Sequence, residues 1–387
     1  MHIRSDDTSK DDLKREDNLM TTKQVMGLIS VLALCAATAW AGQPAPSAEE
    51  GWKPAVARTI TPPGGRAEYY VKTDGDDGKD GLSWADAWKT IKHAVQTAPD
   101  GSTITVAPGT YVENNPLVIN RRLEIRGWGA TPAATIIKPL NDTTLSGDGR
   151  GWFLVTAAVA GDPNVDYGLD LWNVTLDGQG KNVAIGILST TSRINIHDCT
   201  IKNIAWGTGG PPNYYGRGIC AYAYQNNWVA RCTFENIGRI GVFTFGNGVH
   251  TQVTECSYTG KGNGDWLDYG FEGGGGAELD VYWSTVSNCT GAASSDGSVS
   301  AGILATTYWG SGTSLVAEWN FVNNNTIGIA VGYDASDSTL AAAVRYNHLA
   351  SNGWAISNSN PNNLVNGYCN WFGSHDPATV ATQAGTG

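Results

Sequence analysis

The sequence predicts an all-β fold, a solenoid of short parallel strands with one α-helix capping its N-terminal end. A short phrase with an apolar residue at each end recurs at intervals of 24 to 33 residues. Glycine is abundant, at 49 of 387 residues, whereas charged residues make up only 16%. Only one segment repeats its apolar residues with the period of a helix, so strands and turns should account for the rest.

Residues 1–41 have the pattern of an N-terminal extension followed by a signal peptide. From Met20 the chain reads MTTKQVMGLISVLALCAATAWA, in which Lys23 precedes an apolar run and Ala39 to Ala41 fit a cleavage site. The alternative is a retained N-terminal anchor. Cleavage near Ala41 predicts a mature protein that is secreted, periplasmic or on the cell surface.

The remaining chain divides into a linker, one domain and a tail. Residues 42–67, rich in Pro, Ala and Gly, are predicted to be the linker, and residues 377–387 the C-terminal tail. The domain, residues 68–376, opens with a short strand and the loop DGDDGKDG from Asp74. This loop could bind calcium or could make Asx turns that lead into a helix. It lacks the bidentate glutamate of an EF-hand, which favours the turns.

One convincing helix is predicted in SWADAWKTIKHAVQTAPDG. Ser83 is a suitable N-cap, and Asp86 completes a capping-box pattern. Pro99 and Gly101 end the helix. The apolar residues expected on one face are Trp84, Ala87, Trp88, Ile91, Ala94 and Val95. This face should cover the first coil of the solenoid.

The repeated phrase has a key residue three positions after its first apolar residue. The key residues are Val174, Cys199, Cys232, Cys256, Cys289, Asn320 and Asn347. Strands at such intervals are typical of a solenoid, whose coils stack about 4.8 Å apart and bury one continuous core. We therefore expect the four cysteines to form one inward-facing column in consecutive coils, continued by the two asparagines.

A second phrase, a small residue followed by an inward aliphatic residue, falls between copies of the first. The predicted inward residues are Ile187, Ile219, Val242, Leu279, Ile303 and Ile329. Strand residues alternate between faces, so the residues one and three positions later should point outward. In the middle coils these are aromatic: Tyr222, Phe243, Phe245 and Tyr282. They could bind substrate by stacking on sugar rings, or loops could cover them.

With this arrangement the chain resembles the pectin-lyase-like superfamily of secreted β-helix proteins. The resemblance rests on the opening stretch from Tyr69 to Glu113, with its Gly/Asp loop, helix and APGTY turn, and on NGYCNWFG near the C-terminus. It covers residues 68–374 and implies a right-handed parallel β-helix. It implies no single activity, because the superfamily contains lyases, hydrolases, epimerases and proteins with no known catalysis.

Six cysteines remain after the leader, namely the four of the column together with Cys220 and Cys369. An even number in a secreted chain favours disulfides. Side chains stacked in one column point the same way, however, which strains a disulfide and favours free, buried thiols. The sequence does not place Cys220 and Cys369.

The candidate catalytic residues are five carboxylates within GNGDWLDYGFEGGGGAELDVYW. They are Asp265, Asp268, Glu272, Glu278 and Asp280. Paired carboxylates can cleave glycosides, and carboxylates can also hold Ca²⁺ for a lyase; the bland alternative is a solvated acidic loop. We expect residues 260–276, anchored by Trp266, to fold over the outward strand carrying Phe243, Phe245, Asp280 and Tyr282. Two carboxylates would then face an aromatic floor.

The chain has a net charge of −11, which argues against nucleic acid or anionic lipid as a partner. No stretch after the leader is long enough to span a bilayer. The sequence therefore predicts a secreted protein acting on a polysaccharide, either a lyase or a glycosidase. The alternative is a non-catalytic extracellular solenoid that binds glycans or has a structural role. Ca²⁺ is the one candidate cofactor, and no motif identifies its ligands.

Overall fold

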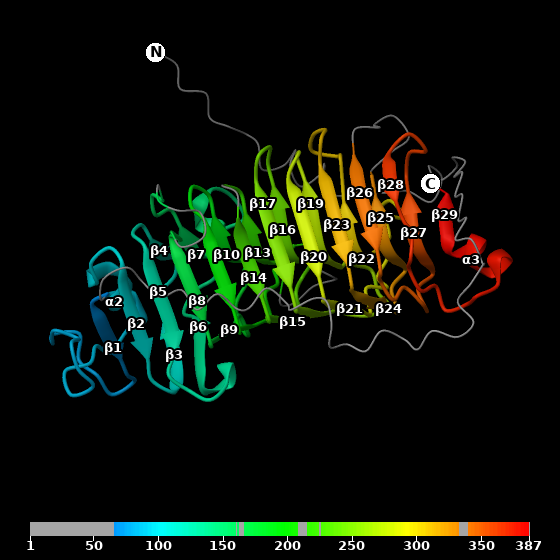
Figure 1. Cartoon of the computed structure of the whole chain (residues 1–387). Coiled ribbons are helices and arrows are strands. Elements are labelled where there is room, and N and C mark those ends of the chain that lie inside the picture. Colours follow the sequence, from blue (N-terminus) through cyan, green and yellow to red (C-terminus); the bar gives the residue numbers. More distant parts are fainter. Residues whose placement is uncertain are drawn as a thin grey trace, which may run out of the picture.

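The computed structural model describes residues 66–159, 161, 166–207, 215–223, 226–332 and 340–386. They form a right-handed parallel β-helix whose coils stack along one axis from the N-terminal to the C-terminal end (Figure 1). Each full coil contributes one strand to each of three parallel sheets, here called A, B and C. The predicted fold class is confirmed. The predicted leader and most of the predicted linker lie outside the described residues.

Sheet A has eleven strands, and its outer face carries the candidate site. In spatial order they are β1 (Glu68–Val71), β2 (Ser102–Val106), β5 (Leu123–Gly127), β8 (Leu169–Trp172), β11 (Ile194–His197), β14 (Asn227–Ala230), β17 (His250–Thr254), β20 (Glu278–Tyr282), β23 (Ser314–Glu318), β26 (Ala341–Arg345) and β28 (Leu364–Asn366). Its inward side chains, such as Ile196, Val229 and Val253, lie in register and are fully buried.

Sheets B and C complete the coil. The eight strands of sheet B are β3 (Gly109–Glu113), β6 (Thr135–Pro139), β9 (Thr175–Asp177), β12 (Thr200–Lys202), β15 (Thr233–Glu235), β18 (Ser257–Thr259), β21 (Thr285–Ser287) and β24 (Phe321–Asn323). The ten strands of sheet C are β4 (Leu117–Ile119), β7 (Gly151–Val155), β10 (Ile185–Ser189), β13 (Arg217–Ala221), β16 (Ile240–Phe245), β19 (Tyr269–Gly274), β22 (Ala301–Ala305), β25 (Ile327–Val331), β27 (Trp354–Asn358) and β29 (Ala384–Thr386). Apolar side chains from all three sheets meet in one core.

A column of glycines lets the coils approach closely in sheet C. A Cβ on Gly241 would lie 2.4 Å from the carbonyl oxygen of Gly270, which no side chain tolerates. The column is Gly186, Gly218, Gly241, Gly270, Gly302 and Gly328. Gly270 was not predicted as a member of this column; it makes Phe271 the inward residue of this coil, in register with Val242. Leu279, predicted for this place, lies in β20 of sheet A instead.

The cysteine column is confirmed for three of its four predicted members. Cys199, Cys232 and Cys256 each precede a strand of sheet B in register, and all three are buried. In the next coil this place belongs to Ser284, because Thr285 pairs with Ser257. The predicted fourth cysteine is therefore wrong.

The column continues through the two predicted asparagines. The Ser284 backbone N–H donates to Asn320 Oδ1 at 2.9 Å, and that of Asn320 donates to Asn347 Oδ1 at 2.9 Å. Cys289 begins a different buried column, in which its N–H donates to Asn325 Oδ1 at 2.9 Å. Among the described residues, Cys199, Cys232, Cys256 and Cys289 are free and buried, and Cys369 is free and exposed. The prediction of free, buried thiols in the column is confirmed.

The capping helix α2 (Ile91–Thr97) is shorter than predicted. It buries Ile91, Ala94 and Val95 in the core, but its N-cap is Thr90 rather than Ser83. Asp77 accepts the backbone N–H groups of Lys89 and Thr90, which holds the chain extended until that point. Ser83 instead accepts the Asp86 N–H at 3.1 Å in a separate turn. The aspartate loop makes the predicted Asx turns, at Asp76 and Asp80.

The other helices are short. Two 3₁₀ turns, η1 (Pro132–Ala134) and η2 (Asp148–Arg150), precede strands. The segment predicted as a tail forms helix α3 (Pro377–Gln383) and strand β29, which pairs with β27. No helix among the described residues is long and apolar enough to cross a membrane.

Candidate functional site

From β8 onward, the chain leaves each strand of sheet A through one residue with a left-handed backbone, and these residues form what we call the corner column. Its members are Asn173, Asp198, Arg231, Glu255, Trp283, Trp319, Tyr346 and Cys369, with φ between 45° and 62°. Asparagine and aspartate tolerate this conformation, whereas bulky residues rarely adopt it, and the strain is of order 1–3 kcal/mol per residue. The turn requires a left-handed conformation at this position, but it does not require aromatic side chains in three successive coils.

The aromatic corner residues reach the surface. Trp319 is 51% exposed and Tyr346 is 38% exposed. Their rings stack, with centroids 4.5 Å apart and planes 11° apart. Trp283 is half-buried against Tyr282, at a centroid distance of 5.6 Å. Three consecutive coils therefore present a row of aromatic rings parallel to the helix axis.

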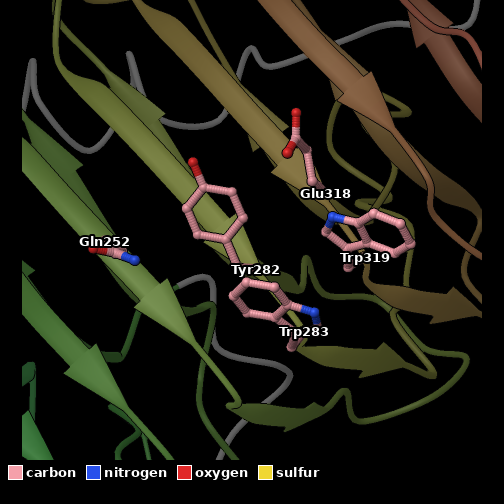
Figure 2. Close-up of a pocket in the computed structure, with 5 residues that line it drawn as sticks. All are labelled: Gln252, Tyr282, Trp283, Glu318 and Trp319. Carbon is pink, nitrogen blue, oxygen red and sulfur yellow. The ribbon is translucent and has the colours of Figure 1, made fainter. Parts of the chain in front are cut away.

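A pocket of about 270 Å³ opens beside this row (Figure 2). It is lined by Gln252, Tyr282, Trp283, Glu318 and Trp319. Tyr282 and Glu318 are in register on neighbouring strands β20 and β23, and each is followed by its corner tryptophan. The pocket thus combines two indoles and a phenol ring with a carboxylate and an amide.

The polar groups at the pocket are held by ion pairs. The Glu318 carboxylate pairs with Arg345, which also donates to Tyr368 Oη at 3.0 Å. His250 Nε2 lies 3.1 Å from Asp280 Oδ2, and this hydrogen bond raises the pKa of His250 above its usual value. Burial, together with the nearby Asp280 and Glu318 carboxylates, raises the pKa of Tyr282 to about 12. The phenol therefore stays protonated and able to donate a hydrogen bond.

A second polar cluster lies on the same face, three coils nearer the N-terminus. His197 Nε2 is 3.3 Å from Asp170 Oδ1, and His197 Nδ1 is 2.7 Å from Asp198 Oδ2. Arg231 donates twice to Asp198, each time at 2.7 Å. Burial by itself would lower the pKa of His197, but the two carboxylates outweigh it and raise this pKa. Since both imidazole nitrogens are engaged, the cluster acts as a brace across neighbouring coils.

Two of the predicted catalytic residues have local structural contacts. Asp265 accepts the Ser294 N–H at 2.7 Å. The Asp268 carboxylate is fully buried, forms an ion pair with Lys261, and accepts from Tyr258 Oη at 3.1 Å. Trp266 lies in the same loop, where its Nε1 donates to Gly262 O at 2.9 Å.

The predicted juxtaposition of this loop with one aromatic floor is wrong. Glu272 is in β19 of sheet C, in register with Phe243 and buried in a second apolar cluster on the outside of that sheet. Tyr222 and Phe245 pack against the same cluster. Asp280 and Tyr282, by contrast, are on sheet A. The prediction had placed Leu279 in the same ladder as Val242, and it therefore treated residues of sheets A and C as one face.

Three predicted residues do lie on the outer face of sheet A: Glu278, Asp280 and Tyr282. Five residues of this site were not predicted from the sequence: Gln252, Trp283, Glu318, Trp319 and Tyr346. The signal that could have found the aromatic ones is their position directly before the key residue of the repeated phrase, where the earlier copies have Asn, Asp, Arg and Glu. Among the described residues, no group of three or more His, Cys, Asp or Glu side chains is arranged to hold a metal ion.

A family model described as "Protein of unknown function (DUF1565)" matches residues 73–354. No curated protein matches the sequence. Among solved structures, similar chains are found in the complex of XylC with xylose and in the GH136 lacto-N-biosidase from Eubacterium ramulus, each at 12% identity and a TM-score of 0.42. The alignments cover 75% and 79% of this chain and 63% and 66% of those chains, so this chain spans just under two thirds of their length.

A third similar structure is the pectin methylesterase PemA from Erwinia chrysanthemi. It is 12% identical with a TM-score of 0.38, and the alignment covers 72% of this chain and 89% of that chain. The first of these structures is a complex with xylose, and the other two are named as a lacto-N-biosidase and a pectin methylesterase. At such low similarity they carry no argument about what this chain binds.

Proposed function

The chain belongs to the family described as "Protein of unknown function (DUF1565)", and we propose that it is an extracellular protein that binds a polysaccharide at the corner of sheets A and B. The predicted signal peptide supports the extracellular location. The fold supports a long binding surface, because each coil offers one more position along the axis.

One observation carries the proposal, the presence of Trp283, Trp319 and Tyr346 at strained corners. Strained, exposed aromatic residues persist where they have a functional role, since neither the core nor the turn requires them. Aromatic faces stack on the C–H faces of sugar rings, while a few polar groups at the same site bind the hydroxyls. Glu318, Gln252 and the protonated Tyr282 supply those polar groups at the pocket.

The test is binding of the purified mature chain to a panel of soluble polysaccharides, measured by affinity electrophoresis and calorimetry. We expect Trp319→Asn to weaken binding about tenfold or more. Its free energy of unfolding should change by less than about 1 kcal/mol, because asparagine relieves the backbone strain as the ring stacking is lost. The matched control is Trp128→Ala, at an indole that is 58% exposed near the N-terminal end. Equal effects of both substitutions would contradict the assignment of the site.

A second candidate function is cleavage of the bound glycan, favoured by the two carboxylates beside Tyr282. Glycoside hydrolysis needs one group to protonate the leaving oxygen and a carboxylate to act as base or nucleophile. The proton held between His250 and Asp280 is suited to the first role, and Glu318 to the second. Release of reducing ends, lost in Asp280→Asn while binding persists, would support hydrolysis. Unsaturated products absorbing in the ultraviolet would indicate a lyase instead, and neither product would leave a binding protein.

A further inference from the structure

We propose that the corner site takes an uncharged glycan chain lying along the helix axis, and not a polyuronate. This inference rests on the proposed function and names its ligand class. It is argued from the charges around the site, from the cations that lie nearest, and from the direction of the aromatic row.

Carboxylates surround the aromatic row. In the corner column the exposed Glu255 directly precedes Trp283 by one coil. Glu318 lines the pocket itself, and Asp280 lies on the strand that carries Tyr282. None of the five residues that line the pocket is a cation. A ligand that carries one carboxylate on every ring would bring each of them toward these groups.

The nearest cations are already engaged. Arg345 is divided between Glu318 and Tyr368. His250 pairs with Asp280, and Arg231 pairs with Asp198 through two hydrogen bonds. Binding a uronate through any of them would break an existing ion pair and expose its carboxylate partner to the ligand. Neutral hydroxyls suit these carboxylates better, because a hydroxyl donates a hydrogen bond to a carboxylate oxygen.

The direction follows from the column. Trp283, Trp319 and Tyr346 occupy the same place in three successive coils, and coils are spaced about 4.8 Å apart. Their side chains therefore form a row parallel to the axis, and the stacked pair Trp319 and Tyr346 extends the row beyond the pocket. Such a row suits an extended chain of several sugar units better than a single sugar.

The test compares neutral polymers (xylan, mannan, galactan and β-glucans) with polygalacturonate and alginate, at low and physiological ionic strength. We expect at least one neutral polymer to bind and both polyuronates to bind about tenfold more weakly or worse, with the larger difference at low salt because screening weakens repulsion. Glu255→Gln should raise polyuronate binding relative to neutral binding. The control Glu235→Gln, an exposed glutamate on sheet B, should leave the ratio unchanged.

The outcomes separate the two proposals. Neutral binding that depends on Trp319 supports both. Polyuronate binding equal to or stronger than neutral binding, and dependent on Trp319, overturns the ligand class and leaves the proposed site in place. Binding of no polymer, or binding that is indifferent to Trp319→Asn, overturns the proposed function and this inference with it.

Discussion

Cys256 lies over Ser284: its backbone N–H donates to Ser284 Oγ at 3.1 Å, and Ser284 Oγ in turn donates to Tyr282 O at 2.9 Å. A serine therefore does in one coil what a cysteine does in the three before it. In each case the side chain lies just after a strand of sheet A and contacts a backbone N–H of the neighbouring coil. The column is therefore held by hydrogen bonds as well as by apolar packing.

This relationship predicts opposite outcomes for two substitutions at Cys256. The free energy of unfolding of Cys256→Ser should lie within about 1 kcal/mol of that of the parent, since serine can make the contacts that Ser284 makes one coil later. Cys256→Asp should prevent secretion of folded protein, because an unpaired carboxylate in a dry column costs several kcal/mol. Thermal and denaturant unfolding measure the first outcome, and the yield of folded, secreted protein measures the second. A parent-like melting temperature for Cys256→Asp would refute the inward assignment.

The asparagine end of the column should tolerate less change. Asn347 Oδ1 accepts two hydrogen bonds from Asn320, and its Nδ2 donates to Ala317 O at 2.8 Å. Asn347→Ala would leave these buried groups without hydrogen-bond partners. We therefore expect the free energy of unfolding, measured with denaturant, to fall by about 2–4 kcal/mol. Asn366→Ala, at an exposed position in β28, is the control and should stay within about 0.5 kcal/mol. Similar losses for both would contradict the ladder.

Asp268, predicted from sequence as catalytic, should prove structural. Its buried carboxylate pairs with Lys261, whose Nζ also donates to Gly238 O at 2.8 Å. Asp268→Asn leaves the ammonium group uncompensated, and we expect it to cost about 3–5 kcal/mol. The half-buried Asp265 offers the comparison, since its carboxylate accepts hydrogen bonds from Ser294 and Asp265→Asn leaves no buried ammonium group uncompensated. A stable Asp268→Asn protein that has lost activity would restore the catalytic reading.

The ion pair of His250 with Asp280 should make stability depend on pH. The folded-state pKa of His250 is raised, chiefly by the hydrogen bond to Asp280. Because this pKa is raised, the contribution of the ion pair to stability is complete below about pH 6.5, the ordinary histidine pKa. It is lost as the pH rises through the folded-state pKa. Unfolding midpoints and the NMR titration of His250 measure this.

Asp280→Asn serves as the control for that titration. It should return the pKa of His250 toward its ordinary value and flatten the pH dependence of stability above about pH 6.5. An ordinary or lowered pKa for His250 in the parent protein would contradict the pairing.

The fold could be predicted because the same physical requirement recurs in every coil. Inward residues such as Ile196, Val229 and Val253 must be apolar, and this repetition is visible in the sequence. The register failed in the coil that carries Cys289, where VSNCTG and VYWSTV both fit the phrase. The pairing of Thr285 with Ser257 decides between them. This pairing could not be predicted from the spacing, because the loop of residues 260–268 adds length between the two strands.

The site was harder to predict for a related reason. Trp283 and Trp319 are adjacent only because their coils stack, and they point outward only because the turn before each key residue is left-handed. Asn or Gly at such a position indicates the left-handed conformation by residue type, whereas an aromatic residue indicates it only by its place directly before the key residue. The carboxylate cluster was conspicuous in the sequence but is divided between two sheets and the loop that carries Asp265 and Asp268.

The most direct test of the account is a crystal structure of the mature chain with a neutral oligosaccharide that binds it in solution. The account predicts a sugar ring in the pocket between Trp283 and Trp319, hydrogen-bonded to Glu318, with the chain continuing along the axis toward Tyr346. An oligosaccharide bound instead on the outside of sheet C, against Tyr222 and Phe245, with the corner left empty, would contradict it.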